Sequence, residues 1–302
     1  MFDNSSKNFS FVGKFKIFAT ISIILCTIGL AGVILTFFGV PAFNFDIDFA
    51  GGVTMEFELG TEVTRQVQDD IAKIFKDVAG VSANVTTSGN SGTSVLVKTV
   101  EIESETREEL FDKIAEKFGE DKVELLSSEY VSASVGNDLK RSALLSTLIA
   151  CALILVYITI RFEFRSGIAA IICLLHDVLI MLAFLIISRL PVNMTFIAAA
   201  LTIVGYSINA TIVVFDRIRE NRKLQRGRGD FAACVDESIW QSMRRSIGTT
   251  ITTLLPVILI IIFGVTSVRI FALPLMVGII AGGYSSTCIA GPLWNKFKGD
   301  EA

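Results

Sequence analysis

Residues 190–221 read LPVNMTFIAAALTIVGYSINATIVVFDRIREN, and this stretch decides the fold class. Its first part, Leu190–Phe215, contains no Lys, Arg, Asp or Glu. About 20 helical residues cross the ~30 Å hydrocarbon core of a bilayer, so this part is long enough to span one. Charged residues begin abruptly at Asp216 and continue through a mostly basic segment. The pattern predicts a transmembrane helix that ends on a basic side of the membrane.

Five further runs of comparable length are also apolar and almost free of charge. Together the six runs predict a membrane protein with a six-helix bundle: Ile17–Val40, Ser142–Ile160, Gly167–Ser188, Leu190–Phe215, Ser246–Val268 and Ile270–Asn295. The chain is 52% hydrophobic and only 19% charged, whereas soluble domains carry ~25% charged residues. This composition excludes a disordered chain and most soluble enzymes.

Basic residues in the connecting segments indicate how the spans are oriented. The four segments richest in basic residues fall on one side if the chain crosses six times, and the positive-inside rule makes that side cytoplasmic. The residues on this side are Lys7, Lys14, Lys16, Arg161, Arg165, Arg217, Arg219, Arg222, Lys223, Arg226, Arg228, Arg244, Arg245, Lys296 and Lys298. The other side has Arg189 and Arg269, each in a predicted short turn, and one long segment. We therefore expect residues 1–16, 216–245 and 296–302 to be cytoplasmic, and residues 17–40 to be a retained span rather than a signal peptide.

The long segment on the opposite side, from about Ala42 to Gly136, is acidic. It holds 8 Lys/Arg and 19 Asp/Glu, a net charge of −11 in a chain whose total is −3. Its hydrophobic periods predict the order β-α-β-β-α-β, typical of a ferredoxin-like α+β domain. The predicted elements are Gly52–Leu59, Thr61–Lys76, Val81–Thr87, Thr93–Val100, Ser104–Phe118 and Lys122–Ser134, with a hairpin turn at 88–92. We expect an extracytoplasmic domain over residues 41–137, inserted between the first span and a five-helix bundle over residues 138–295.

His176 and Asp177 are ionisable residues in the middle of a predicted span. Such residues are rare and costly in a membrane, and they suggest an ion or proton pathway. Histidine titrates near neutral pH, so His176 can pass protons. The alternative is a mutually satisfied structural pair.

Two predicted spans also carry polar faces. Thr202, Tyr206 and Asn209 share one helix face, which we expect to point into the bundle because unpartnered polar groups are unfavourable in lipid. Arg245 shares a face with Thr249 and Thr252. Asn209 and Arg245 are therefore further candidates for an ion pathway. The alternative for the first face is helix–helix packing, and Arg245 either turns inward toward a titratable partner or extends to the headgroups.

Other patterns give weaker signals. Gly278 and Gly282 form a GxxxG pair, which indicates close helix packing. Apolar residues every fourth position in 230–245 predict a short amphipathic helix on the membrane surface. No Cys/His ligand spacing, ATPase motif or hydrolase motif occurs, so we expect no metal site, no cofactor and no enzymatic activity. The near-zero net charge suggests no nucleic-acid partner.

Several strings resemble the SecF proteins of the SecD/SecF family of bacterial protein export. The longest is Gly205-Tyr206-Ser207-Ile208-Asn209, followed by Ile212 to Asn221 with Asp216-Arg217 inside it. Asp46 to Gly52, including Asp48, Phe49, Gly51 and Gly52, is similar to the family's Asp-Phe-x-Gly-Gly motif. Leu175-His176-Asp177 and the segment Arg245 to Thr253 also match. The resemblance covers essentially the whole chain.

The resemblance implies a function, a location and partners. It implies a multi-pass subunit of the bacterial cytoplasmic (inner) membrane that pairs with SecD as one half of an arrangement related to the RND transporters. It further implies work with the SecYEG channel on a translocating polypeptide, downstream of SecA, driven by the proton or sodium motive force. Membrane lipid surrounds such a subunit.

One position departs from the family pattern. The resemblance implies an Asp after Asn209, facing the Arg that matches Arg245, but this chain has Ala210. Because alanine cannot titrate, ions either take another route, such as His176 and Asp177, or the chain is a structural subunit with lost coupling. An RND-type exporter of small molecules or lipids is the remaining alternative.

Overall fold

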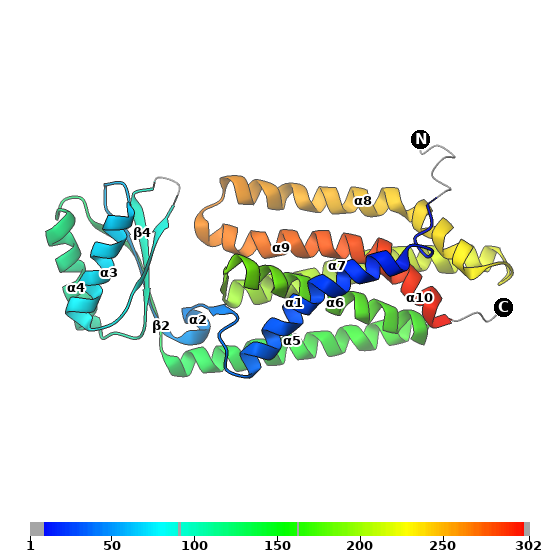
Figure 1. Ribbon diagram of the computed structural model, residues 1–302, viewed down its shortest axis with the longest axis horizontal. Coiled ribbons are helices and arrows are strands. Elements are labelled where there is room, and N and C mark those ends of the chain that lie inside the picture. The colour runs from blue at the N-terminus through cyan, green and yellow to red at the C-terminus, as the bar shows by residue number, and fades with distance from the viewer. Residues whose placement is uncertain (1–8, 90–91, 162, 299–302) are drawn as a thin grey trace.

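The computed structural model describes residues 9–89, 92–161 and 163–298. Lys7, the centre of the expected hairpin turn at 90–91 and the last four residues of the expected C-terminal segment lie outside the described residues, as does the side chain of Arg161. The described chain forms a helical bundle and a small α+β domain, which Figure 1 shows end to end.

Among the described residues, six helices are long and apolar enough to cross a membrane, which agrees with the expected number of spans. The bundle consists of α1 (Phe15–Phe37), α5 (Ala133–Arg161), α6 (Phe164–Ser188), α7 (Met194–Leu224), α8 (Phe231–Phe263) and α9 (Thr266–Ser285), which continues through the π-helix η2 (Ser286–Ala290) into α10 (Gly291–Lys298). The start of α1 and all of α10 lie at the end of the bundle away from the sheet (Figure 1). The described residues thus place the basic segments at one end and the acidic domain at the other.

The start of α5, the end of α8 and the start of α9 differ from the bounds of the predicted spans. Helix α5 begins at Ala133 rather than Ser142, so it extends out of the predicted span toward the α+β domain. The break between the last two spans lies at Gly264 and Val265, and Arg269 is in the first turn of α9. The Gly264 backbone N–H donates to the Ile260 carbonyl, which closes α8 before the turn.

The expected separate surface helix at 230–245 is also wrong, because α8 runs without interruption from Phe231 to Phe263. Asp230 caps its first turn by accepting hydrogen bonds from two backbone N–H groups. Val235 and Ile239 are fully buried against Trp294 of α10 rather than lying on the membrane surface. The apolar stripe of this segment therefore packs inside the bundle.

The α+β domain contains a four-stranded antiparallel sheet with the strand order β3-β4-β2-β5. Its elements are β2 (Gly52–Glu58), α3 (Arg65–Ala79), β3 (Asn84–Ser88), β4 (Ser94–Thr99), α4 (Ser104–Phe118) and β5 (Glu124–Val131). Helices α3 and α4 cover the face of the sheet that is turned away from the bundle (Figure 1). Met55, Phe57, Ile71, Phe75 and Leu110 form the centre of a core with almost no exposed surface. Apolar packing holds the domain together.

A short junction joins this domain to the bundle. Strand β1 (Asn44–Phe45) pairs in parallel with β6 (Pro191–Val192), which lies between α6 and α7. Helix α2 (Ile47–Ala50) follows β1, and Asp46 caps it while forming a 2.6 Å ion pair with Lys98 of the sheet. The junction thus links the turn between two spans to the first strand of the domain.

Candidate functional site: a buried histidine–aspartate pair

Glycines let the spans approach closely around the middle of the bundle. A Cβ on Gly278 of α9 would lie 2.6 Å from Ile203 of α7 and 2.7 Å from the sulfur of Met181 of α6. A Cβ on Gly282 would lie 3.2 Å from the Ser207 Cβ. The predicted close packing at this GxxxG pair is confirmed, and it brings α9 against both α6 and α7.

His176 and Asp177 lie at this crossing on α6. Their exposed fractions are 6% and 0%. The imidazole Nδ1 of His176 lies 2.8 Å from Asp177 Oδ1. An ionisable pair is therefore enclosed by protein at the middle of a span, where charge is costly unless it is partnered.

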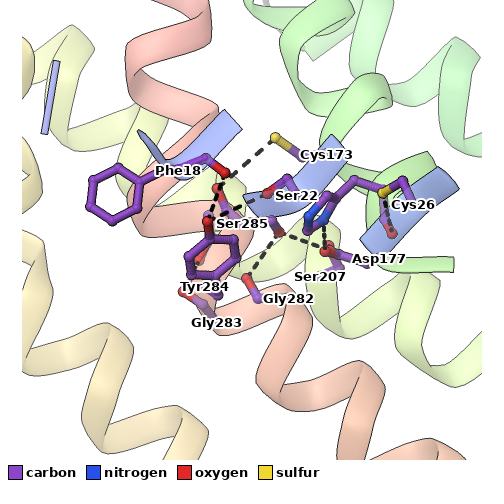
Figure 2. Close-up of polar contacts among 12 residues, drawn as sticks. Phe18, Ser22, Cys26, Cys173, Asp177, Ser207, Gly282, Gly283, Tyr284 and Ser285 are labelled. Carbon is purple, nitrogen blue, oxygen red and sulfur yellow. Dashed lines mark hydrogen bonds and ion pairs between the residues drawn. The ribbon is translucent and has the colours of Figure 1, made fainter. Parts of the chain in front are cut away.

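The second carboxyl oxygen of Asp177 accepts hydrogen bonds from two hydroxyl groups on other helices. Ser207 of α7 donates to Oδ2 over 2.5 Å, and Ser285 of α9 donates to the same atom over 2.8 Å. Figure 2 shows Asp177 between these two serines. Hydrogen bonds to a charged group are the strong ones, so this carboxyl group ties three spans together.

Helix α1 closes the other side of the pair. The Tyr284 ring stacks on the His176 ring with centroids 6.0 Å apart, and its hydroxyl donates to the Phe18 carbonyl over 3.0 Å. Ser22 of α1 donates to the same tyrosine oxygen over 3.4 Å (Figure 2). A Cβ on Gly29 would lie 2.2 Å from the Leu179 carbonyl, so α1 also packs closely on α6.

The arrangement suits proton binding. If Nδ1–H donates to the carboxylate, then Nε2 of His176 is the atom that gains or loses a proton, and Nε2 has no hydrogen-bond partner among the described residues. No group of three or more His, Cys, Asp or Glu that could hold a metal occurs within the described residues.

The predicted polar faces of α7 and α8 do not join this site. Thr202 and Asn209 are exposed, which contradicts the expectation that they point into the bundle. The physical reason is the 100° helical repeat: Asn209 is two residues from Ser207, so when Ser207 faces Asp177 the asparagine faces outward. Tyr206 lies between these faces, and its hydroxyl donates to Thr250 of α8 over 2.9 Å. Gly205 is exposed on the same side.

Arg245 does not turn into the bundle. Its side chain is exposed near the basic end of α8, and it has no ion-pair partner in the described part of the chain. Thr249 and Thr252 are exposed on the same helix and bond to carbonyls of their own turn. Ala210, the position where the resemblance implies Asp, is half-buried.

The Asp-Phe-x-Gly-Gly motif builds the junction. Asp48 accepts a 3.0 Å hydrogen bond from the backbone N–H of Met194, the first residue of α7. Phe49 is 4% exposed and packs on the bundle. Gly51 and Gly52 have positive φ values of 75° and 137°, and a Cβ on Gly52 would lie 2.3 Å from the Thr99 carbonyl oxygen. The glycine pair thus provides a turn and a close backbone approach that residues with a side chain would not allow.

Asp216 and Arg217 mark the basic end of α7. Arg217 donates to Gln241 of α8 over 2.6 Å, and Asn221 donates to the same oxygen over 2.8 Å. Asp216 lies 3.8 Å from Arg219 one turn later. These residues fasten α7 to α8 far from the His176 pair.

Sequence reasoning missed four contributors: Ser22, Ser207, Tyr284 and Ser285. Each carries a hydroxyl group in an apolar span, and such residues occur in many membrane helices without any special role. The GxxxG pair was the one signal, because close packing at Gly282 places the next residues of α9 beside α6.

Comparison with known proteins identifies the family. A family model described as "Protein export membrane protein SecD/SecF, C-terminal" matches residues 111–300. The chain belongs to the SecD/SecF family. The matched residues include His176, Asp177, Ser207 and Ser285, so the buried site lies within the SecD/SecF region of the chain.

Curated SecF proteins match the chain nearly end to end. Protein translocase subunit SecF of Alicyclobacillus acidocaldarius is 39% identical over 275 residues, which cover 90% of this chain and 88% of that protein. Protein translocase subunit SecF of Sebaldella termitidis is 37% identical and covers 83% of this chain and 81% of that protein. Both the bundle and the α+β domain therefore fall within the aligned lengths.

The crystal structure of SecDF from Thermus thermophilus has the same fold over this chain. It superposes with a TM-score of 0.85 at 33% identity, covering 96% of this chain and 38% of that one. The structure of SecDF in a super-membrane-facing form superposes with a TM-score of 0.69 over 96% of the chain. The chain thus spans less than half of the SecDF proteins and corresponds to one part of them.

Proposed function

We propose that this chain is a membrane subunit of SecD/SecF-type protein translocation, in which proton movement at His176 and Asp177 is coupled to its α+β domain. The family match supports the translocation role. The buried pair, with hydroxyl partners on two further spans, is the observation that carries the coupling. The role is one of transport rather than catalysis.

The topology belongs to the same proposal. Six spans and the distribution of basic residues support a bacterial inner-membrane protein with both termini cytoplasmic. Residues 17–40 and 138–295 supply the spans, residues 216–245 form a cytoplasmic loop that α7 and α8 largely build, and residues 41–137 form the extracytoplasmic domain. Its element order and antiparallel pairing support a ferredoxin-like class. The bundle would be one half of an RND-like arrangement.

SecD is the proposed partner within the membrane. The fused SecDF relatives join a sequence like this one to further chain, of which this chain covers about two fifths. The exposed polar face with Asn209 and Arg245 supports the contact, because polar groups in lipid are unfavourable unless another helix covers them. SecYEG, SecA and the translocating polypeptide are partners of the assembled complex in this proposal.

The coupling follows from the connections between the pair and the outer domain. A charge that crosses the membrane field supplies ~2.3 kcal/mol per 100 mV. Protonation at Nε2 of His176 changes the charge that the Asp177 carboxyl group faces, and this group holds α6, α7 and α9 together. The N-terminus of α7 carries the change to the domain through Asp48 and through the β1–β6 pairing.

A structural subunit without ion coupling is the second candidate. Ala210 supports it, because the chain has no carboxyl group at the position that the resemblance pairs with Arg245. No feature of the described outer domain favours a small-molecule exporter.

Ion flux into vesicles that contain this chain and its SecD partner separates these candidates. Asp177→Asn and His176→Gln should each lower proton flux by about tenfold or more, equivalent to at least ~1.4 kcal/mol. Asp230→Asn is the matched control, because asparagine caps a helix as well as aspartate does. Unchanged flux in Asp177→Asn would refute the proposed route. A large gain of flux and export in Ala210→Asp would instead identify a subunit with lost coupling.

A further inference from the structure

A basic cavity of about 410 Å³ lies at the end of the bundle away from the outer domain. The end of α7, the start of α8 and helix α10 line it, together with Glu163 just before α6. Its lining residues are Glu163, Ile218, Arg219, Arg222, Lys223, Arg226, Gly227, Phe231, Trp294 and Lys298. The His176 site and the junction contribute nothing to it, so the translocation mechanism leaves this cavity unassigned.

Five cationic side chains and one carboxylate line this cavity. Gathering like charges around one space is unfavourable unless an anion is present to offset their repulsion. Arg222 also donates to the Arg228 and Gly229 carbonyls, so one wall of the cavity is an ordered loop. A positive-inside surface needs basic residues, but it does not need them to converge on a cavity.

Aromatic rings form the inner wall. Phe231 lies under Lys298, whose Nζ is 4.3 Å from the ring centroid, and it packs on Trp294 with centroids 5.6 Å apart. Trp294 is 2% exposed, and its Nε1–H is buried with no hydrogen-bond partner among the described residues. A buried indole N–H normally has a partner, and Trp294 is one of the residues that line the cavity, so this donor is available to an acceptor oxygen of a bound ligand.

We propose that this cavity binds the phosphate group of an anionic phospholipid. Cationic side chains and a neutral N–H donor match the charge and the acceptor oxygens of a phosphodiester. Basic pockets between spans on the cytoplasmic side suit such headgroups.

Apolar surface beside the cavity favours a lipid over a soluble phosphate. Phe164, the first residue of α6, follows the lining residue Glu163 and is 74% exposed. Side chains of this kind at a membrane border contact acyl chains.

Fluorescence of Trp294 provides a direct assay. The chain has 2 tryptophans, so Trp240→Phe leaves Trp294 as the reporter. The full chain in detergent is titrated with phosphatidylglycerol, with phosphatidylcholine and with inorganic phosphate. We expect saturable emission changes with phosphatidylglycerol and much weaker responses to the other two. Saturation by inorganic phosphate at equal affinity would overturn the lipid as the source of the phosphate.

Two double variants remove the same charge from different places. Lys223→Gln with Lys298→Gln removes two cavity cations and should weaken phosphatidylglycerol binding about tenfold. Arg228→Gln with Lys296→Gln removes two nearby cations whose side chains do not line the cavity, and binding should stay within about twofold. Equal weakening in both would overturn a specific site in favour of general surface charge.

Trp294→Phe tests the indole donor without removing a charge. Lipid retention is then counted by native mass spectrometry, which needs no tryptophan. We expect about tenfold or more weaker retention of phosphatidylglycerol, as for loss of one hydrogen bond to a charged group. Retention equal to that of the parent chain would refute the assignment of Nε1–H to the phosphate.

Discussion

The hydroxyl partners of Asp177 give the sharpest test of the buried site. Ser207→Ala and Ser285→Ala each remove one hydrogen bond to Oδ2 and leave the other in place. The two serines are 1% and 0% exposed, so water does not readily replace the lost donor. Ser242→Ala is the matched control, because Ser242 is 6% exposed and bonds only to carbonyls of its own helix.

The size of the expected loss of unfolding free energy follows from the kind of hydrogen bond that each serine donates to Asp177. A hydrogen bond to a charged group contributes ~1.5–3 kcal/mol in soluble proteins, whereas interhelical bonds in a membrane protein average ~0.6 and reach ~1.7 kcal/mol. We therefore expect each single variant to lose about 1.5 kcal/mol of unfolding free energy. Ser207→Ala should be at least as costly as Ser285→Ala, because its bond is the shorter one and Ser285 lies 3.3 Å from a second acceptor at Gly282.

The double variant should lose more than the sum of the singles. One hydroxyl still satisfies Oδ2 in each single variant, but the double variant leaves this buried oxygen without either donor, which adds about 1 kcal/mol. Equilibrium unfolding in mixed detergent measures the free energy of unfolding of the two single variants, the double variant and the Ser242→Ala control. Strictly additive losses, or a loss in Ser242→Ala equal to that in Ser285→Ala, would refute Asp177 as the shared acceptor.

Two further predictions concern packing and pH. Gly278→Ala should destabilise the bundle by about 1–3 kcal/mol, because the added Cβ would overlap side chains of two neighbouring helices. Gly248→Ala is the control: no atom lies within 4 Å of the added Cβ, so this variant should be neutral or stabilising in the same unfolding assay. Hydrogen bonds from Ser94 and Thr93 lower the pKa of Glu58 from its ordinary value of 4.5, so this stabilisation is present above that pH and is lost as the pH falls through the lowered pKa. Ser94→Ala should therefore reduce the stability of the outer domain at neutral pH and flatten its acid dependence, measured by circular dichroism between about pH 3 and 7; an unchanged acid limb would contradict this reasoning.

The apolar period of the sequence predicted the bounds of a helix where that period alone determines which residues are buried. Ser104–Phe118 was predicted with the observed bounds, and residues of its apolar period, such as Leu110 and Ile114, are buried. The first helix of the domain, α3, begins at Arg65 rather than Thr61, because the Thr64 side chain caps it by accepting a hydrogen bond from the Val67 backbone N–H. The segment 230–245 was placed on the membrane surface because an amphipathic period alone does not say which partner covers it.

The membrane class, the number of spans and the sorting of charge by side were determined by the sequence alone. These properties depend on the length and composition of individual segments, and each segment responds to the bilayer independently. His176 and Asp177 were candidates for the same reason, because an ionisable residue within an apolar run is visible without knowledge of its neighbours.

Only the tertiary structure decided which polar groups meet. Ser207 and Ser285 lie 30 and 108 positions from Asp177 along the chain, yet both donate to one of its oxygens. Spans that are apolar on nearly every side give no periodicity that marks the inward face, so the sequence favoured Asn209 while the packed bundle turned Ser207 inward. The close approach of helices at Gly278 and Gly282 selects that face, because steric fit between whole helices is a property of the assembled bundle.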